Sequence, residues 1–184
     1  MTSNAVGDGR PADRAALRGL PPTERDAQGR VRHAALTDAD TQLPNRLHFD
    51  VVYRLLWEAG GRGIPVTLLR FDLPGFGLTP PDYQTRVGER LNLVTRQMDM
   101  IARLSEDRFA VLLMDCNASG GVLAAERFET EMAEDLTQTG MGFRAGLAAW
   151  KEWMVKPDDL MIAAEEAMAV AWSARGRSIE VHRR

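Results

Sequence analysis

The sequence of 184 residues contains a single cysteine, Cys116, and only two lysines, Lys151 and Lys156. One cysteine excludes an internal disulfide and fits a reducing compartment, so we expect a cytoplasmic protein. No apolar run approaches the roughly 20 residues needed to span a bilayer. The N-terminus shows no basic segment followed by an apolar one, the pattern of an export signal. The net charge of −3 also gives no overall excess of positive charge that would favour binding to nucleic acid.

Two kinds of site are missing as well. The three histidines, His33, His48 and His182, lie far apart and have no metal-ligand spacing. No glycine-rich phosphate loop is present. These absences exclude a histidine-bound metal centre and a nucleotide site built on such a loop.

The chain divides into two parts by composition. Residues 1–35 are rich in Gly, Pro, Asp and Arg and contain few large apolar residues, which predicts a mobile N-terminal tail or linker. Within this tail, the sequence allows a short helix over residues 13–20, which Gly19 and the Pro21-Pro22 pair would end. Residues 36–184 have the apolar content of one folded domain.

Apolar periodicity predicts the elements of this domain. The helix at 44–60 is expected to place Leu47, Phe49, Val52, Leu55 and Leu56 on one face, and the helix at 119–136 to place Val122, Leu123, Ala125, Phe128 and Met132 inward. A hairpin is expected at 100–114, and Pro157 with two acidic residues should open the last helix. The remaining elements are strands at 65–73, 142–150 and 178–182 and a helix at 82–96, with Val87, Leu91, Val94 and Met98 inward.

Several short motifs occur in a fixed order along this domain. They are Thr41-Gln42-Leu43-Pro44-Asn45-Arg46, Phe71-Asp72-Leu73-Pro74-Gly75-Phe76, Gly88-Glu89, Phe109-Ala110-Val111-Leu112-Leu113, Ala125-Glu126-Arg127 and Ala164-Glu165-Glu166-Ala167-Met168.

In sequence and order these motifs resemble the GGDEF domain of bacterial diguanylate cyclases, over residues 36–184. The resemblance implies an α+β fold, a ferredoxin-like palm of the nucleotidyl cyclase kind, with a mostly antiparallel central sheet flanked by helices. Members of the family join two GTP molecules, each held by one subunit of a dimer, into cyclic di-GMP. This reaction needs metal ions and donors that hold the phosphates.

The signature hairpin of the family is altered here. Ser105-Glu106-Asp107-Arg108-Phe109 stands where the resemblance implies Gly-Gly-Asp-Glu-Phe. The two glycines of the family let the backbone approach a phosphate closely, whereas Glu106 adds negative charge there. Arg108 replaces an acidic residue and can neither act as a base nor bind a metal. The sequence therefore predicts a degenerate domain that is not an enzyme.

Among the other functional positions of the family, some keep their residue type in this sequence and others have lost it. Asp72 and Asp107 match the metal-binding acids, and facing carboxylates suit Mg²⁺; they are interpreted as vestigial, and no cofactor is expected to be required. The guanine-reading asparagine falls on Pro80, and the guanine-reading aspartate on Glu89. The phosphate-binding lysine falls on Ser173, although Arg177 matches the arginine that follows it.

A product-binding pattern of the family is retained. Many members bind cyclic di-GMP at a motif Arg-x-x-Asp that ends five residues before the signature, and Arg96-Gln97-Met98-Asp99 has this register. A further arginine of the family's site matches Arg127. Guanidinium groups can pair bidentately with phosphate or with the guanine edge. In the other interpretation, Arg96 and Asp99 form an ordinary ion pair on a helix surface, and a short helix before the hairpin displaces Arg96.

The leading hypothesis is an inactive GGDEF-like domain that acts as a cyclic di-GMP receptor through Arg96, Asp99 and Arg127. Because no output domain is recognised, its signal is expected to pass to an unidentified protein partner in trans. The alternatives are a nucleotide-independent interaction or scaffold domain, and a domain with residual GTP binding or weak cyclase activity. The sequence leaves a homodimer open.

Overall fold

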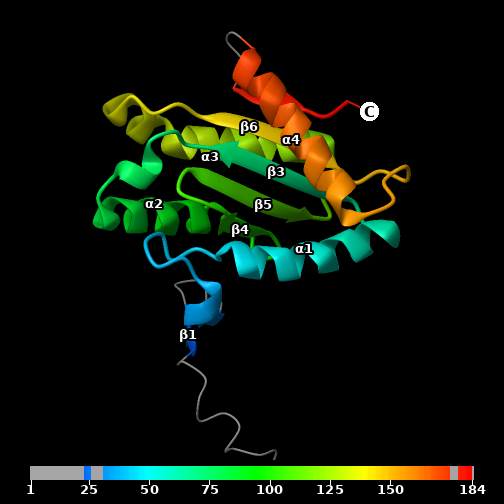
Figure 1. Cartoon of the computed structure of the whole chain (residues 1–184), viewed down its shortest axis with the longest axis horizontal. Helices are drawn as coiled ribbons and strands as arrows, with labels where there is room; N and C mark the ends of the chain where they lie inside the picture. The colour runs from blue at the N-terminus through cyan, green and yellow to red at the C-terminus, as the bar shows by residue number, and fades with distance from the viewer. Residues whose placement is uncertain (1–22, 26–30, 175–177, 184) are drawn as a thin grey trace, which may run out of the picture.

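A five-stranded sheet forms the centre of the domain, in the order β4-β5-β3-β6-β7 (Figure 1). In this computed structural model, residues 23–25, 31–174 and 178–183 are described. All neighbouring strands are antiparallel except β6 and β7, which are parallel. The sheet strands are β3 (Val66–Asp72), β4 (Met100–Arg103), β5 (Arg108–Met114), β6 (Arg144–Ala149) and β7 (Ile179–Val181), and the α-helices are α1 (Arg46–Gly61), α2 (Pro81–Leu93), α3 (Ala118–Thr139) and α4 (Pro157–Ser173).

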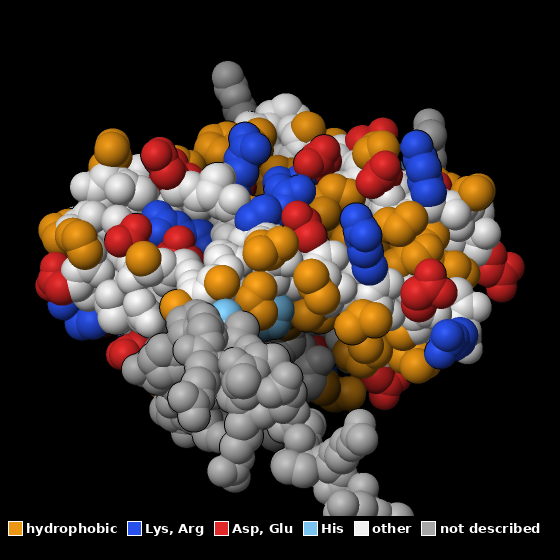
Figure 2. Space-filling view, turned by 60° about the horizontal axis from the view of Figure 1, so that its bottom comes forward, with side chains coloured by type: hydrophobic (Ala, Val, Ile, Leu, Met, Phe, Trp, Pro, Cys, Tyr) orange, Lys and Arg blue, Asp and Glu red, His pale blue; other side chains and the backbone are white. Residues whose placement is uncertain are grey.

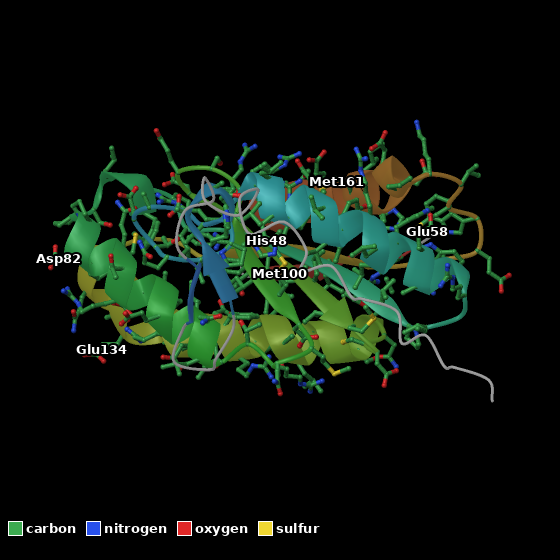
Figure 3. The ribbon with its side chains drawn as sticks, turned by 90° about the horizontal axis from the view of Figure 1, so that it is seen from below. His48, Glu58, Asp82, Met100, Glu134 and Met161 are labelled. Carbon is green, nitrogen blue, oxygen red and sulfur yellow. The ribbon has the colours of Figure 1, made fainter. Side chains whose placement is uncertain are left out.

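The helices form two layers, with α1 and α4 on one face of the sheet and α2 and α3 on the other (Figures 1 and 3). Successive side chains of a strand point to opposite faces, so Leu68 of β3 packs with Phe49 in one apolar cluster. Its neighbour Leu69 packs with Phe128 in the other cluster. The α+β fold and the predicted order of elements are confirmed.

Local signals explain where the helices begin. Asn45 and Asn117 cap α1 and α3, since their side chains accept hydrogen bonds from the backbone N–H groups of His48 and Gly120. Pro157 and the acidic Asp158 and Asp159 open α4, as predicted. In contrast, α2 ends at Leu93, earlier than the predicted Arg96.

Part of the predicted core is wrong. Leu47, Leu55, Met98 and Leu123 are all more than half exposed. The buried face of α1 consists instead of Phe49, Tyr53, Leu56 and Gly60. At 3.6 residues per turn, Leu47 and Leu55 lie on the opposite side of the helix from that row. The apolar residues predicted for one face of α1 therefore lie on two sides of the helix, and only one of these sides is buried.

The predicted tail is described only in part. Residues 1–22, including the helix considered at 13–20, lie outside the described residues. Strands β1 (Thr23–Arg25) and β2 (Val31–His33) form a small antiparallel ladder, which the short 3₁₀ helix η2 (Ala34–Leu36) follows. A bridge between Thr37 and Pro44 then leads into α1. Within the part of the chain that the structure describes, no helix has the length and apolar character to cross a membrane.

Candidate functional site

The signature hairpin joins β4 to β5 in a turn that does not need glycine. The backbone N–H of Leu104 donates to the carbonyl of Arg108 at 2.7 Å. Ser105, Glu106 and Asp107 all lack positive φ angles, so the loss of the family's glycines causes no backbone strain. The change lies in the space around the turn, because a Cβ atom on Gly77 would lie 2.7 Å from the Cβ of Glu106. The Glu106 side chain thus lies against the loop after β3, which contains Gly77.

Arg103, the last residue of β4, holds this turn in place. Its guanidinium group donates to the backbone carbonyls of Ser105 and Glu106. It also pairs with the carboxylates of Asp38 at 3.0 Å and Asp40 at 3.3 Å. The Arg103 side chain is only 6% exposed. A buried cation therefore ties the hairpin to the segment before α1, a role that the sequence analysis missed.

Asp107 serves the structure of a neighbouring loop. Its two carboxylate oxygens accept hydrogen bonds from the backbone N–H groups of Gly75, at 3.0 Å, and Gly77, at 2.8 Å. Gly75 has a φ of 86° and precedes the 3₁₀ helix η3 (Phe76–Leu78), so the turn presents its amides together, as an anion-binding nest does. The Asp107 carboxylate fills this nest.

Asp72, the other predicted metal ligand, lies at the end of β3 between two arginines. Its register partners across the sheet are Arg108 on β5 and Arg144 on β6. The indole N–H of Trp172 donates to its carboxylate at 3.3 Å. Burial raises the pKa of Asp72, although the Trp172 hydrogen bond and the charge of Arg108 act in the opposite direction.

This arrangement does not fit a magnesium ion. Mg²⁺ prefers several oxygen ligands in octahedral geometry, but both oxygens of Asp107 are engaged by amides. The cross-strand neighbours of Asp72 add positive charge where an ion would add its own. The negative charge of Asp107 acts on Asp72 and raises its pKa, but the hydrogen bonds of Asp107 go to the loop after β3.

The positions expected to read guanine and phosphate carry other chemistry. Pro80 is the N-cap of α2 and has no side-chain hydrogen bond there. Glu89 is exposed on the same helix. The hydroxyl of Ser173 donates to the carbonyl of Val170 within α4. Arg177 lies outside the described residues. The loop after β3 is closed further by Gln84, whose side-chain amide donates to the carbonyl of Thr79 at 2.8 Å.

Arg96 and Asp99 lie at the opposite end of the β4–β5 hairpin, in the turn between α2 and β4. Because α2 ends at Leu93, these two residues do not lie on a helix surface. Arg96 is exposed. Asp99 is 5% exposed, and its carboxylate accepts a hydrogen bond from the backbone N–H of Met114 at 3.1 Å. Asp99 therefore fixes this turn against the end of β5.

Arg127 comes to the same region from α3. The three predicted residues all act on the buried Cys116, which follows β5. Burial raises the pKa of the Cys116 thiol, and the negative charge of Asp99 raises it further. The positive charges of Arg96 and Arg127 act on the same thiol and lower its pKa. All three predicted residues therefore lie within electrostatic reach of one thiol.

The Arg127 side chain is not fully satisfied by the protein. Its Nε atom is buried and meets no hydrogen-bond acceptor among the described residues. The guanidinium carbon lies 5.7 Å from the ring centre of Phe128. A buried donor without an acceptor costs free energy.

Comparison with known proteins identifies the domain. The family model described as diguanylate cyclase, GGDEF domain, matches residues 82–178. The chain belongs to the GGDEF family. It is 30% identical over 166 residues to the uncharacterized protein y4lL of Sinorhizobium fredii, a match that covers 83% of this chain. The chain spans only 20% of the length of that relative.

Solved structures of GGDEF domains have the same fold. The GGDEF domain of DgcB from Caulobacter crescentus, in complex with c-di-GMP, aligns with a TM-score of 0.68 at 23% identity. That alignment covers 83% of this chain and 99% of DgcB's. The diguanylate cyclase SiaD from Pseudomonas aeruginosa, in complex with its activator SiaC, aligns with a TM-score of 0.68 at 18% identity. It covers 79% of this chain and 61% of SiaD's.

Proposed function

We propose that this GGDEF domain is catalytically inactive and serves as a receptor for cyclic di-GMP, passing the signal to a protein partner. The observation that carries the proposal is the contrast between the two ends of the β4–β5 hairpin. At the signature end, the groups that would hold metal and phosphate are used by the protein itself. At the other end, Arg96 is exposed, the Arg127 Nε is buried without an acceptor among the described residues, and both charges act on the Cys116 thiol.

The argument for inactivity rests on charge and space. Phosphoryl transfer depends on cations and amides placed around the triphosphate. Here the Asp107 carboxylate fills the amide nest of Gly75 and Gly77, and it would repel a phosphate there. Arg108 cannot replace the acidic residue that it displaces in the signature.

The argument for a receptor rests on the arginines. Guanidinium groups suit a ligand with two phosphates and two guanine edges. Arg96 is exposed, and Arg127 carries an unpaired buried N–H group. Asp99 is expected to act mainly as a positioning residue, because it is buried and holds the end of β5.

Isothermal titration of the whole chain with cyclic di-GMP, and separately with GTP, tests this proposal. We expect heat from cyclic di-GMP and none from GTP with Mg²⁺. The protein is also expected to make no cyclic di-GMP from GTP with Mg²⁺ or Mn²⁺. Product above a metal-free control, measured by mass spectrometry, would show that the domain is a working cyclase.

Restoring the signature is expected to leave the domain inactive. In the variant Ser105→Gly, Glu106→Gly, Arg108→Glu, the hairpin matches the family, but Pro80 and Ser173 still lack the groups that would bind guanine and phosphate. Catalysis depends on several positioned groups at once. The same mass-spectrometric assay measures the result. Turnover by this triple variant would locate the whole defect in the hairpin.

One observation favours a second candidate, a nucleotide-independent interaction domain. Asp99 is buried and already accepts the Met114 N–H group, so the Arg-x-x-Asp motif also has a purely structural use. Under this alternative, neither nucleotide gives heat at high micromolar concentration. Asp99→Asn would then change stability without affecting any ligand.

A further inference from the structure

Helix α1 exposes a row of aliphatic side chains on the side that faces away from the sheet. Leu47, Val51 and Leu55 are spaced four residues apart, and they are 56%, 54% and 66% exposed. Residues at this spacing form one continuous row on a helix. Figure 2 brings the lower side of Figure 1 forward, and it shows hydrophobic side chains interspersed with charged ones at the centre and right of this side. These three residues are called the α1 row below.

A second row on α1 carries charges of alternating sign. Arg46, Asp50, Arg54 and Glu58 are also spaced four residues apart and lie on one flank of the α1 row. Arg46, Arg54 and Glu58 are exposed, and Asp50 is half-buried. Within the chain, Arg46 pairs with Asp50 at 2.9 Å. The signs run plus, minus, plus, minus from the start of the helix to its end.

This order of signs suits one partner in particular. When two copies of a helix meet antiparallel around a two-fold axis, the same flank of each helix faces the other. Arg46 then meets Glu58 of the partner subunit, and Asp50 meets Arg54 of the partner subunit. Every pair across the axis joins opposite charges. In a parallel pair the two-fold axis runs along the helices, so the charged flank of each copy faces the other flank of its partner and these opposite charges do not meet.

We propose that the α1 row is the contact surface for a second copy of this chain, with the two α1 helices antiparallel. Val51 lies near the axis, where the aliphatic residues of both copies are removed from water. Three aliphatic side chains form a small contact surface, and interfaces below about 1,200 Å² are mostly weak or transient. We therefore expect a dissociation constant on the order of 10–100 µM.

Such a dimer would keep the two signature hairpins apart. The backbone N–H of Arg103 donates to the carbonyl of Pro44 at 2.9 Å, which places the hairpin beside the first turn of α1. A helix of 16 residues is about 24 Å long, and antiparallel pairing puts the two hairpins at its opposite ends. This dimer does not depend on cyclic di-GMP and does not face one signature toward the other.

Sedimentation velocity of the full chain without nucleotide, from about 10 to 500 µM, tests the proposal around the expected dissociation constant. Val51→Asp is expected to weaken the dimer at least tenfold, because it places two carboxylates at the axis. Leu123→Asp is the matched control, since Leu123 is exposed on α3, and should leave the dimer unchanged. Circular dichroism confirms that each variant is folded.

Charge reversals test the antiparallel orientation. Arg54→Glu and Asp50→Lys should each weaken the homodimer, because each creates like-charge pairs across the axis. An equimolar mixture of these two variants should regain dimerisation, since every pair in the mixed dimer again joins opposite charges. Wild-type protein that stays monomeric at the highest concentration, a dimer insensitive to Val51→Asp, or a mixture no better than its components would each overturn the proposal.

Discussion

Replacing Arg103 with alanine is expected to lower the free energy of unfolding by about 3–5 kcal/mol, the cost of removing one partner from a buried charge pair. The guanidinium group is nearly inaccessible and pairs with Asp38 and Asp40. It also donates hydrogen bonds to the backbone carbonyls of Ser105 and Glu106. Without it, these acceptors would be left in a partly buried space. Urea denaturation followed by circular dichroism measures the change.

Arg86→Ala is a matched control for this variant. Arg86 pairs with Asp82 at 2.8 Å, but both side chains are well exposed, so its removal should cost less than about 1 kcal/mol. A similarly small loss for Arg103→Ala would show that water replaces the guanidinium group. It would contradict the role assigned to Arg103 in holding the hairpin.

The destabilisation caused by Arg103→Ala should depend on pH. Burial raises the pKa of Asp38, but hydrogen bonds from Thr41 and the pairing with Arg103 outweigh it, and the net pKa is lowered. A carboxyl whose pKa is lower in the folded state contributes stability above its unfolded pKa, near 3.9. This contribution is lost as the pH falls through the folded value. The difference between wild type and variant should therefore shrink in acid.

Local patterns were enough to predict the order of the elements. Periods of apolar residues, a proline with two acids before α4 and a short turn between two apolar strands are all signals within one stretch of chain. Each of them describes hydrogen bonding or packing that forms within a few residues. For this reason the hairpin at 100–114 and the start of α4 were predicted closely.

Contacts between distant parts of the chain were not predictable in this way. Arg103 lies in a short apolar strand, and its partner Asp38 is 65 residues away. Nothing near either residue indicates that they meet. The end of α2 at Leu93 and the exposed Leu47 and Leu55 have the same origin, since packing against the sheet decides which apolar residues are covered. The Asp107 contacts depend on the approach of two loops.

The predicted product site was a set of positions taken from a resemblance, and in the structure they come from two separate parts of the chain. Arg96 and Asp99 belong to one turn, and Arg127 comes from a different element. Their common effect on Cys116 places them in one neighbourhood. The burial of Asp99 was not predictable from its spacing to Arg96, because it depends on the end of β5. Its role is therefore expected to be more structural than that of the two arginines.

The double variant Arg96→Ala, Arg127→Ala is expected to abolish measurable binding of cyclic di-GMP. Each charge-assisted hydrogen bond to the ligand contributes about 1.5–3 kcal/mol, so the loss of both arginines should weaken binding by roughly a hundred- to ten-thousandfold. Each single variant should lose about one half of this free energy if the two contacts are independent. Isothermal titration under the same conditions measures the affinities of the two single variants and gives a lower limit for the dissociation constant of the double variant.

Removal of two positive charges could weaken the binding of any anion, so the control removes the same charge elsewhere. Arg62→Ala, Arg86→Ala deletes two exposed arginines of α2 and the end of α1, outside the proposed site. Its affinity for cyclic di-GMP should stay within about twofold of wild type, because exposed charges beyond a Debye length of about 8–10 Å are screened. Added salt should weaken binding to the wild type and to this control alike, since their phosphate contacts are the same. If the double variant at Arg96 and Arg127 binds as tightly as wild type, the ligand lies elsewhere on the domain. If wild type itself gives no heat, the two arginines serve the fold alone.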